Sequence, residues 1–343
     1  MLADYAIRFL RRATALAGAA ALSLGAGSAA AQEKLTFAVD WIINGGHAGY
    51  FMAVTNGYFK QEGLDVTVVR GQGSGDTVKR VASGGADFGQ ADAGTIIANI
   101  GNSDVPLKII AVVYGNASIG LIYTVESGIK GPKDLEGRKI AKTAGSASMT
   151  LFPAFLAVNN VDRDKITEVN VTGSSFLPLL LSRQVDGVVD QKTNLPRYQK
   201  PAAAQGLTVR PMAYADYGLG VYGNALIATD RMIAEKPKVI AGFVRAAMRG
   251  LADAFADPDA AIANLRTTNP EVNAEIAKEQ LLGIAEFVLV DDVRKHGYGY
   301  IDRAKMEKTR SLIADALKLK RTLATDDVYT AQFLPNPPIM PKK

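Results

Sequence analysis

Cysteine is absent from this 343-residue sequence, and histidine occurs only twice, at His47 and His296. A chain without cysteine forms no disulfide and offers no thiolate for catalysis, for zinc or for an iron–sulfur cluster. It also offers no cysteine for a lipid anchor after a signal sequence. Two histidines are too few for a histidine-rich metal site. We therefore expect no metal site and no cofactor.

A strong excess of one charge sign is also lacking. Lys and Arg outnumber Asp and Glu by 39 to 34, which gives a net charge of +5. So small a surplus on a large surface favours neither nucleic acid nor a membrane as a partner. Beyond the N-terminus, no segment is apolar over the length needed to cross a bilayer. The composition, 48% hydrophobic and 21% charged, is that of an ordinary globular protein.

The N-terminal segment departs from this composition. Arg8, Arg11 and Arg12 precede an alanine-rich apolar run at 13–27, and three alanines stand directly before Gln32. This order is typical of a secretory signal peptide cut before Gln32, and it predicts a freely diffusing periplasmic protein. The adjacent arginines leave twin-arginine export as an alternative route. The run is too short and too alanine-rich to favour a membrane anchor.

The next stretch holds the strongest signal for ligand binding. An alternating strand ends at Val39 and leads to the single tryptophan, Trp41, then to a loop with Asn44 and two glycines before His47 begins a helix. Asn44 is suited to cap that helix, and the glycines let backbone approach a ligand closely. An aromatic ring, an amide and an imidazole beyond the end of a first strand form a plausible small-molecule site in an open α/β sheet. The alternative is structural, with Trp41 in the core and Asn44 as a cap alone.

Two further loops repeat the order of strand, small residues and helix. GQGSGD at 71–76 and TAGSAS at 143–148 each follow a predicted strand and open a predicted helix. Free N–H groups at a helix start can bind a ligand oxygen, which makes the serines in both loops candidate contacts. Asp76, in the first loop, has a structural alternative, since an acidic residue there complements the helix dipole.

A short internal repeat relates two segments of the chain. SGGADFGQ at 83–90 and SRQVDGVV at 182–189 each place a helix end, a turn and an aspartate before a short apolar strand. If the repeat reflects two similar α/β halves, Asp92 and Asp190 would lie beyond equivalent strands and on opposite walls of one cleft. Chance similarity over eight residues is the alternative.

Strands and helices alternate along most of the chain, with predicted crossings between two halves near 113–116 and 216–224. From Glu235 onward apolar residues recur at helical spacing, and we assign no chemistry to this helical portion. No catalytic residue is predicted. The predicted ligand-binding residues are Trp41, Asn44, His47, Tyr50, Ser74, Gly75, Asp76, Asp92, Tyr114, Ser146, Ala147, Ser148, Asp190, Tyr222 and Asn224.

Motifs for catalysis are lacking. The sequence holds no Gly-x-Ser-x-Gly elbow between strand and helix, no Walker loop and no dinucleotide fingerprint after a strand. GQGSGD has the glycines of a phosphate loop without its Lys-Ser/Thr ending. His47 could act as a base, but the sequence places no nucleophile beside it. We therefore expect a binding protein and no enzyme.

The order strand, Asp-Trp, Asn, His-Ala-Gly-Tyr and NGYFKQEGLDV resembles the periplasmic solute-binding proteins of the thiamine-pyrimidine-precursor and nitrate/sulfonate/taurine group. The resemblance extends over 71–92, 128–141 and LFPAF at 151–155. It implies a two-lobed type II periplasmic-binding-protein fold of two α/β domains joined by a two-segment hinge. It also implies an ABC permease and a cytoplasmic ATPase as partners of a monomeric receptor.

This fold predicts three parts of the chain. They are a signal peptide at 1–31, a first lobe at 32–113 plus 222–343 with the C-terminal helices, and a second lobe at 114–221. Closure of the lobes on a solute would report occupancy to the permease.

The class of solute is predicted from the candidate loops. They bring Asp76, Asp92 and Asp190, and the nearby cations are Lys142 and Lys192. Buried carboxylates prefer partners that donate hydrogen bonds, which with the aromatic residues favours a neutral or amino-bearing heterocycle such as a thiamine pyrimidine precursor. Sulfonate, taurine or nitrate binding by the same fold is the alternative.

Two departures bear on these alternatives. Pyrimidine-binding members of the family show a proline where this chain has Ile43, and the AGSAS loop looks closer to that of sulfonate binders. Fungal thiamine-pyrimidine synthases share the fold but use a cysteine-rich run and a sacrificial histidine. This chain has Gly218 to Tyr222 and Gly94 at those places, so the synthase chemistry is not expected.

Overall fold

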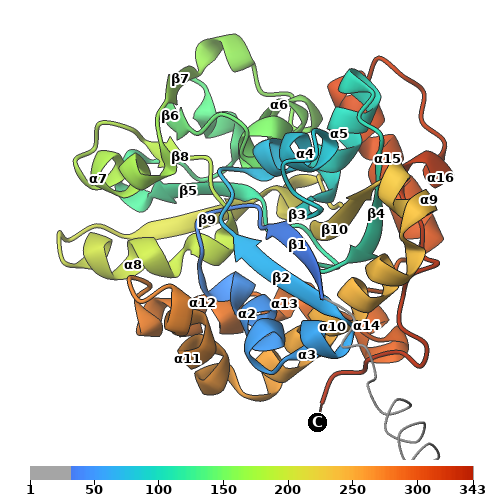
Figure 1. Ribbon diagram of the computed structural model, residues 1–343. Coiled ribbons are helices and arrows are strands. Elements are labelled where there is room, and N and C mark those ends of the chain that lie inside the picture. Colours follow the sequence, from blue (N-terminus) through green and yellow to red (C-terminus); the bar gives the residue numbers. More distant parts are fainter. Residues whose placement is uncertain (1–31, 343) are drawn as a thin grey trace, which may run out of the picture. The chain divides into compact units, whose positions relative to one another are not determined.

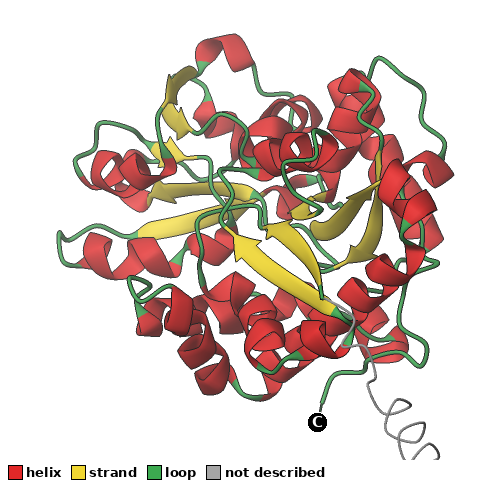
Figure 2. Cartoon of the chain, in the orientation of Figure 1, coloured by secondary structure: helices red, strands yellow, loops and turns green. Residues whose placement is uncertain are grey.

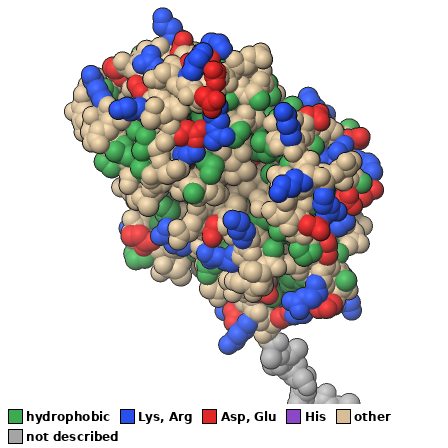
Figure 3. Space-filling view, turned by 90° about the horizontal axis from the view of Figure 1, so that it is seen from above, with side chains coloured by type: hydrophobic (Ala, Val, Ile, Leu, Met, Phe, Trp, Pro, Cys, Tyr) green, Lys and Arg blue, Asp and Glu red, His purple; other side chains and the backbone are tan. Residues whose placement is uncertain are grey.

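The computed structural model describes residues 32–342, and residues 34–343 form one compact unit. The predicted signal peptide lies outside the described residues. Among the described residues, no helix combines the length and the apolar character needed to cross a bilayer. On the face seen in Figure 3, acidic and basic side chains are interspersed, with no broad area of one sign.

The unit contains two five-stranded sheets, which Figures 1 and 2 show side by side with helices packed around them. The first sheet has the order β2-β1-β3-β10-β4. Its strands are β1 (Glu33–Ala38), β2 (Leu64–Val69), β3 (Phe88–Asp92), β4 (Leu107–Val112) and β10 (Asn224–Thr229). We call this sheet, with the helices packed on it, the first lobe.

The second sheet has the order β7-β6-β8-β5-β9, and with its own helices it forms the second lobe. Its strands are β5 (Gly120–Thr124), β6 (Lys139–Lys142), β7 (Thr167–Asn170), β8 (Gly187–Val188) and β9 (Val209–Ala213). The two orders correspond strand by strand. In each sheet the fourth strand, β10 or β5, runs antiparallel to its neighbours, and each of these strands directly follows a crossing from the other lobe.

The helices of the first lobe include those of the C-terminal third. They are α2 (Ala48–Thr55), α3 (Tyr58–Gln61), α4 (Ser74–Ala82), α5 (Ala93–Ser103), α9 (Asp230–Glu235), α10 (Pro237–Ala256), α11 (Pro258–Thr268), α12 (Ala274–Gly283), α13 (Ala285–Val288), α14 (Asp291–His296), α15 (Arg303–Leu317) and α16 (Thr325–Val328). The second lobe has α6 (Ala147–Val158), α7 (Phe176–Leu181) and α8 (Pro196–Ala203). Short 3-10 turns are η1 (Gly45–His47), η2 (Val125–Ser127), η3 (Pro132–Leu135), η4 (Arg163–Lys165), η5 (Gly173–Ser175), η6 (Lys192–Asn194) and η7 (Tyr214–Tyr217).

Aromatic packing fixes α10 beneath the first sheet. The rings of Phe88 on β3 and Phe243 on α10 stack with centroids 3.8 Å apart, and Phe37 on β1 meets Phe243 edge-on at 5.1 Å. All three side chains are fully buried. Burying an aromatic side chain contributes about 1.5–3 kcal/mol, so this cluster helps hold β1 in the orientation that presents the loop after it.

The internal repeat is structural. Asp87 donates its backbone N–H to the carbonyl of Thr36 and accepts the N–H of Thr36 on its carboxylate at 2.7 Å. Asp186 makes the same pair of bonds with Lys139, whose N–H lies 2.8 Å from the carboxylate. Each aspartate thus joins the third strand in the order of its sheet, β3 or β8, to the second, β1 or β6, and the repeat marks equivalent places in the two lobes.

The crossings between the lobes run side by side. The backbone N–H groups of Val113 and Tyr114 donate to the carbonyl of Asn224, and Gly223 donates to the carbonyl of Tyr114 at 3.0 Å. These bonds bring the predicted crossing segments into one two-segment connection. The exact lobe boundaries at residues 114 and 221 stay a prediction.

Candidate ligand-binding site

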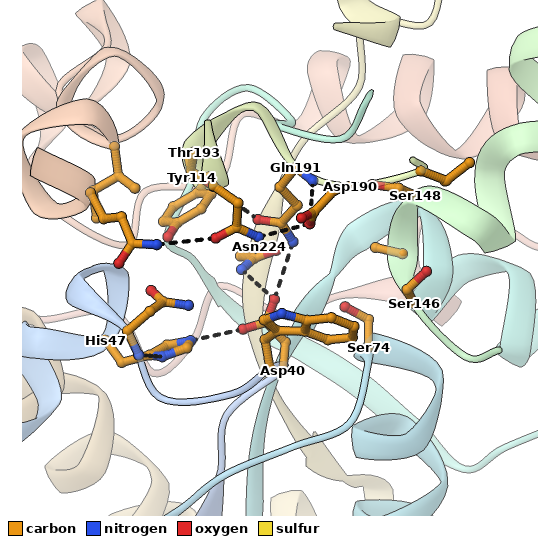
Figure 4. A pocket seen from close by; sticks show the side chains of 17 residues that line it. Asp40, His47, Ser74, Tyr114, Ser146, Ser148, Asp190, Gln191, Thr193 and Asn224 are labelled. Atoms are coloured by element: carbon orange, nitrogen blue, oxygen red, sulfur yellow. Dashed lines mark hydrogen bonds and ion pairs between the residues drawn. The ribbon is translucent and has the colours of Figure 1, made fainter. Parts of the chain in front are cut away.

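A pocket lies where loops from both lobes meet (Figure 4). It encloses about 510 Å³ of space between protein atoms, open solvent at its mouth included. Its lining residues are Asp40, Trp41, Asn44, His47, Ser74, Tyr114, Ser146, Ala147, Ser148, Val189, Asp190, Gln191, Thr193, Asn194, Asn224, Gln280 and Ile284.

Asp40 lies on the first-lobe wall, two residues beyond the end of β1, and is 3% exposed. One of its oxygens accepts from His47 Nε2 at 3.0 Å and from the amide of Gln90 on β3. The other accepts from Asn224 Nδ2 at 3.0 Å and from Gln191 Nε2 at 3.4 Å (Figure 4). Four donors therefore surround this carboxylate, and the longest bond is the one from the second lobe.

The hydrogen bonds of His47 assign its tautomer. Its Nδ1 accepts the backbone N–H of Asn44 at 3.2 Å, so the ring proton lies on Nε2, which donates to Asp40. His47 therefore serves Asp40 as a hydrogen-bond donor, and no Lys or Arg stands among the described lining residues. Asn44 is the predicted cap of η1, since its Oδ1 accepts from Gly46 N at 2.8 Å.

Asp190 lies on the second-lobe wall and is 5% exposed. Its Oδ1 accepts from Asn194 Nδ2 at 2.7 Å and from the N–H of Gln191, and its Oδ2 accepts from the buried hydroxyl of Tyr198 at 2.6 Å. Burial raises the pKa of Asp190, and the hydrogen bonds from Tyr198 and Asn194 oppose that rise.

Gln280 on α12 links the two walls. Its Oε1 accepts from Gly45 N at 3.2 Å in the first lobe, and its Nε2 donates to Asn194 Oδ1 at 3.3 Å in the second. Ile284, one helical turn further, adds an apolar contact to the lining. The helical C-terminal portion, to which the sequence assigned no chemistry, thus contributes two lining residues.

The serines come from helix starts, as predicted. Ser146 caps α6, its Oγ accepting from Met149 N at 3.2 Å, and Ser74 Oγ accepts from Asp92 N at 3.0 Å. Three backbone donors near the pocket are already used. Gly75 N donates across to Gly145 O at 2.9 Å, and Gly45 and Gly46 donate to side chains of this chain.

The structure brings ten predicted residues to the pocket wall. They are Trp41, Asn44, His47, Ser74, Tyr114, Ser146, Ala147, Ser148, Asp190 and Asn224. Trp41 and Asp190, predicted to face one gap from two lobes, are both among them.

Three predicted residues, Tyr50, Asp76 and Tyr222, are absent from the pocket lining. Tyr50 turns into the first-lobe core, edge-on to Phe37 with centroids 4.8 Å apart. The side chain of Asp76 is 42% exposed and pairs with Arg80 one turn along α4 at 3.2 Å. The hydroxyl of Tyr222 accepts from Asp302 N at 2.9 Å, so it faces the start of α15.

Gly75 and Asp92 are also absent from the lining. The N–H of Gly75 is taken by the second lobe, as described above. Asp92 is 1% exposed and caps α5, its Oδ1 accepting from Thr95 N at 3.0 Å. Counted from the matched aspartates of the repeat, Asp92 lies five residues on and Asp190 four, so the two positions are not equivalent. Burial, together with the nearby charge of Asp40, raises the pKa of Asp92 to about 7, although hydrogen bonds from Thr95 oppose the rise.

Seven lining residues were missed by sequence reasoning, namely Asp40, Val189, Gln191, Thr193, Asn194, Gln280 and Ile284. Asp40 stood in the Asp-Trp pair that carried the resemblance, which was a usable signal. The segment 191–194 lies just beyond the short apolar strand predicted after Asp186, so its position was a second signal. Gln280 offered none, because it meets Gly45 across 235 residues of sequence.

The charge of the pocket is one-sided. Within the described residues 32–342, its lining includes the carboxylates Asp40 and Asp190 but no Lys or Arg. Lys142, one of the cations predicted nearby, pairs with Glu168, and Lys192 pairs with Glu286. The aromatic lining residues are Trp41 and Tyr114, and burial raises the pKa of Tyr114, which keeps its hydroxyl protonated.

Comparisons with known proteins agree with this architecture. Residues 44–261 match the sequence model of the NMT1/THI5-like family. The chain is 24% identical to the riboflavin-binding protein RibY of Chloroflexus aurantiacus, over 88% of this chain and 86% of the relative. It is 25% identical to the formylaminopyrimidine-binding protein of Halalkalibacterium halodurans, over 73% and 74%. Fungal 4-amino-5-hydroxymethyl-2-methylpyrimidine phosphate synthases are further relatives.

Among solved structures, the chain is similar to the alkanesulfonate-binding protein SsuA from Xanthomonas axonopodis pv. citri bound to MOPS. The TM-score is 0.66 at 17% identity, and the match covers 87% of this chain and 98% of that one. At this identity the likeness concerns the fold. It confirms the predicted two-lobed α/β periplasmic-binding-protein fold.

Proposed function

We propose that this chain, which belongs to the NMT1/THI5-like family, is the solute-binding receptor of an ABC importer in the periplasm. It captures a small amino-bearing or neutral heterocycle, such as a thiamine pyrimidine precursor, between its lobes. The relatives named for riboflavin and formylaminopyrimidine binding support this class of solute. A permease and an ATPase are the partners that such a receptor requires.

The observation that carries the proposal is the charge of the pocket. Two buried carboxylates face it, and none of its 17 described lining residues is Lys or Arg. A buried carboxylate is stabilised by a partner that donates hydrogen bonds or carries positive charge, and it repels an anion at short range. An exocyclic amino group or a protonated ring nitrogen meets that requirement.

The bond from Gln191 to Asp40 marks where such a donor fits. At 3.4 Å it is the longest of the four bonds to the carboxylate, so it is the one that a solute donor displaces at least cost. Trp41 and Tyr114 offer ring faces and edges to a flat solute. The serines at the starts of α4 and α6 can bind its ring nitrogens or hydroxyls.

The sequence and the pocket also argue against the two alternatives, a receptor for sulfonate, taurine or nitrate and a thiamine-pyrimidine synthase. A sulfonate or nitrate site favours cations in its wall, whereas the described lining residues of this pocket include no Lys or Arg. Synthase chemistry uses a cysteine-rich run and a sacrificial histidine, and this chain has Gly218 to Tyr222 and Gly94 at those places. A receptor returns its solute chemically unchanged.

The test is a titration of purified protein with 4-amino-5-hydroxymethyl-2-methylpyrimidine, formylaminopyrimidine, riboflavin, taurine, an alkanesulfonate and nitrate. Binding is followed by the fluorescence of Trp41, the only tryptophan, and by calorimetry. We expect one of the heterocycles to bind and the anions not to bind. Tight binding of the anions alone would exclude the proposed solute class, and chemical conversion of a bound heterocycle would exclude the receptor role.

A further inference from the structure

We propose that the C-terminal segment 329–342 covers the open edge of the first sheet, and that this cover keeps the edge strand β4 from pairing with β4 of a second copy of this chain. We call residues 329–342 the C-terminal strap. The contacts that hold the strap on β4 lie within the first lobe, and the identity of the solute does not enter.

The edge strand β4 is of a kind that needs a cover. It is the last strand in the order of the first sheet, and its sequence LKIIAV carries one charge, at Lys108, and no proline. Charged residues and proline are the usual devices that keep an edge strand from pairing with another chain. Every residue of β4 except Lys108 is nevertheless buried, whereas only two of the six residues of β2, at the opposite edge, are buried. Other parts of the chain must therefore cover β4.

The cover begins with hydrogen bonds to the backbone of β4. Thr330 N donates to Ile109 O at 2.9 Å, and Tyr329 and Ile109 form a parallel β-bridge. Further along β4, Val112 N donates to Gly299 O at 3.1 Å in an antiparallel bridge. The strap and the turn around Gly299 thus occupy backbone groups of β4 with which a further strand would pair.

The strap also holds the turn that contains Gly299. Tyr298 N donates to Ile339 O in the strap at 2.8 Å. A Cβ built on Gly297 would lie 2.9 Å from both Ile339 O and Pro338 Cβ, so the strap passes directly over this glycine. Gly297 has a φ of +90°, which glycine adopts without strain. Displacement of the strap would therefore loosen both segments that cover β4.

Polar contacts fix the chain at both ends of the strap. Just before the strap, the backbone carbonyl of Asp326 on α16 accepts from Lys108 of β4, and the carboxylate of Asp326 pairs with Arg303. At the far end, Lys342 Nζ lies 2.6 Å from the carboxylate of Asp253 on α10. Exposed ion pairs contribute little to stability, so these contacts orient the strap more than they hold it.

The main anchor of the strap is a buried aromatic ring. Phe333 is 5% exposed and belongs to the same buried cluster as Phe243 of α10, with Leu334 packed against that cluster. Figure 1 shows the segment after α16, in red, on the side of the first sheet where β4 lies. Burial of a phenylalanine ring is favourable, so the middle of the strap is held by the core of the first lobe itself.

A second copy of this chain is the partner that fits an uncovered β4. Pairing of strand edges uses backbone groups, and each copy offers the same ones. Antiparallel pairing of two β4 strands is symmetric, so a single contact closes into a dimer and does not continue into a filament. The strap is tethered to the same chain and competes at an effective concentration on the order of millimolar, so it excludes the second copy at lower protein concentrations.

The experiment loosens the strap in the full chain. Thr330→Pro removes the N–H that donates to Ile109 O, and Phe333→Ala removes the buried anchor. Met340→Ala is the matched control, because Met340 is an apolar strap residue that is 41% exposed. Hydrogen exchange followed by mass spectrometry reports on residues 107–112 and, as an internal reference, on 64–69. Light scattering gives the oligomeric state, and thermal unfolding checks that each variant is folded.

We expect the amides at 107–112 to exchange about tenfold faster in Thr330→Pro and Phe333→Ala than in the wild-type protein at low protein concentration, with exchange at 64–69 unchanged. As the concentration rises, both variants should form a dimer. Exchange at 107–112 should then slow again, because the edge of a second copy replaces the strap. Met340→Ala should behave like the wild-type protein in every measurement.

Three results would overturn the inference. Wild-type exchange at 107–112 in the folded variants would show that the strap does not cover β4. Faster exchange in variants that stay monomeric would exclude a second copy as the partner, and a dimer without renewed protection of 107–112 would place the dimer contact elsewhere. Should Phe333→Ala fail to fold, Thr330→Pro carries the test, since it keeps every buried side chain of the strap. No solute is used, so a failed titration would leave this test intact.

Discussion

The two walls of the pocket each carry a buried aspartate, and the two carboxylates are held in different ways. Asp190 receives all of its hydrogen bonds from its own lobe, from Tyr198, Asn194 and the N–H of Gln191. Asp40 receives three from its own lobe and a fourth, longer one from Gln191 across the gap. The difference indicates that Asp190 stabilises the fold of its own lobe. Asp40 is the carboxylate that accepts hydrogen bonds from groups on the opposite side of the pocket.

The helix starts at the two walls show the same asymmetry. In the first lobe, Gly45 N donates to Gln280 on α12, and Gly75 N donates to the carbonyl of Gly145 in the second lobe. In the second lobe, Ser146 caps its own helix and is satisfied locally. Substitutions in the first lobe should therefore change binding and closure, and those at Asp190 should change stability first.

The largest effect is expected from Asp190→Ala. The substitution leaves the buried hydroxyl of Tyr198 and the amide of Asn194 without their acceptor, and buried unsatisfied groups are costly. We expect a loss of about 2–4 kcal/mol in the free energy of unfolding, measured by urea denaturation. Tyr198→Phe, which removes one of these bonds, should cost about 1 kcal/mol. Unchanged stability with a large loss of affinity would instead make Asp190 a direct solute contact.

Asp40→Asn tests the opposite wall. Loss of the negative charge should weaken binding of an amino-bearing heterocycle roughly 30-fold, which corresponds to about 2 kcal/mol, measured by calorimetry. Asp87→Asn makes the same change of charge elsewhere in the first lobe and should leave affinity within about twofold. Equal losses in both variants would mean that the effect comes from the lobe and not from the pocket.

Much of the fold could be predicted from the sequence because its signals are local. Alternating strands, helix caps at Asn44 and Ser146, and the repeat around Asp87 and Asp186 each act over a few residues. The short apolar strand predicted after Asp87 is observed at Phe88–Asp92, directly beyond the aspartate that joins β3 to β1.

The site could be predicted only where a loop directly follows a strand. Trp41, His47 and the serines were found in this way. Gln280 was not, because a helix-spaced glutamine carries no sign that it will meet a loop 235 residues earlier. Asp92 was predicted to face the cleft, but a carboxylate after a strand can equally cap the next helix. Its hydrogen bond from Thr95 N shows that it caps α5.

Asp92, the N-cap of α5, predicts a pH dependence of the free energy of unfolding, with an effect of intermediate size. Burial raises the pKa of Asp92 to about 7, above its value in the unfolded chain, so between about pH 4 and 7 the native state holds a proton that the unfolded state releases. The contribution of Asp92 to stability therefore falls as pH rises through this window. Asp92→Asn keeps a capping oxygen and cannot ionise, and it should be more stable than wild type at pH 8 by on the order of 1 kcal/mol.

The measurement is urea denaturation of both proteins at pH 5 and pH 8. The advantage of Asp92→Asn should be present at pH 8 and should shrink at pH 5, where the wild-type carboxyl is protonated in the native state. A difference between the two proteins that does not change with pH would show that Asp92 does not titrate in this window.

The smallest effect is expected from Asp76→Ala. This aspartate was predicted to bind the solute, yet its side chain points to solvent and pairs with Arg80 on the same helix. An exposed pair of this kind contributes about 0.3–0.5 kcal/mol, and salt screens it. We expect stability to fall by no more than that and the Kd for the solute, measured by calorimetry, to stay within about twofold. A tenfold loss of affinity would show that α4 turns toward the solute when the lobes move, and it would return Asp76 to the first-lobe wall beside Asp40.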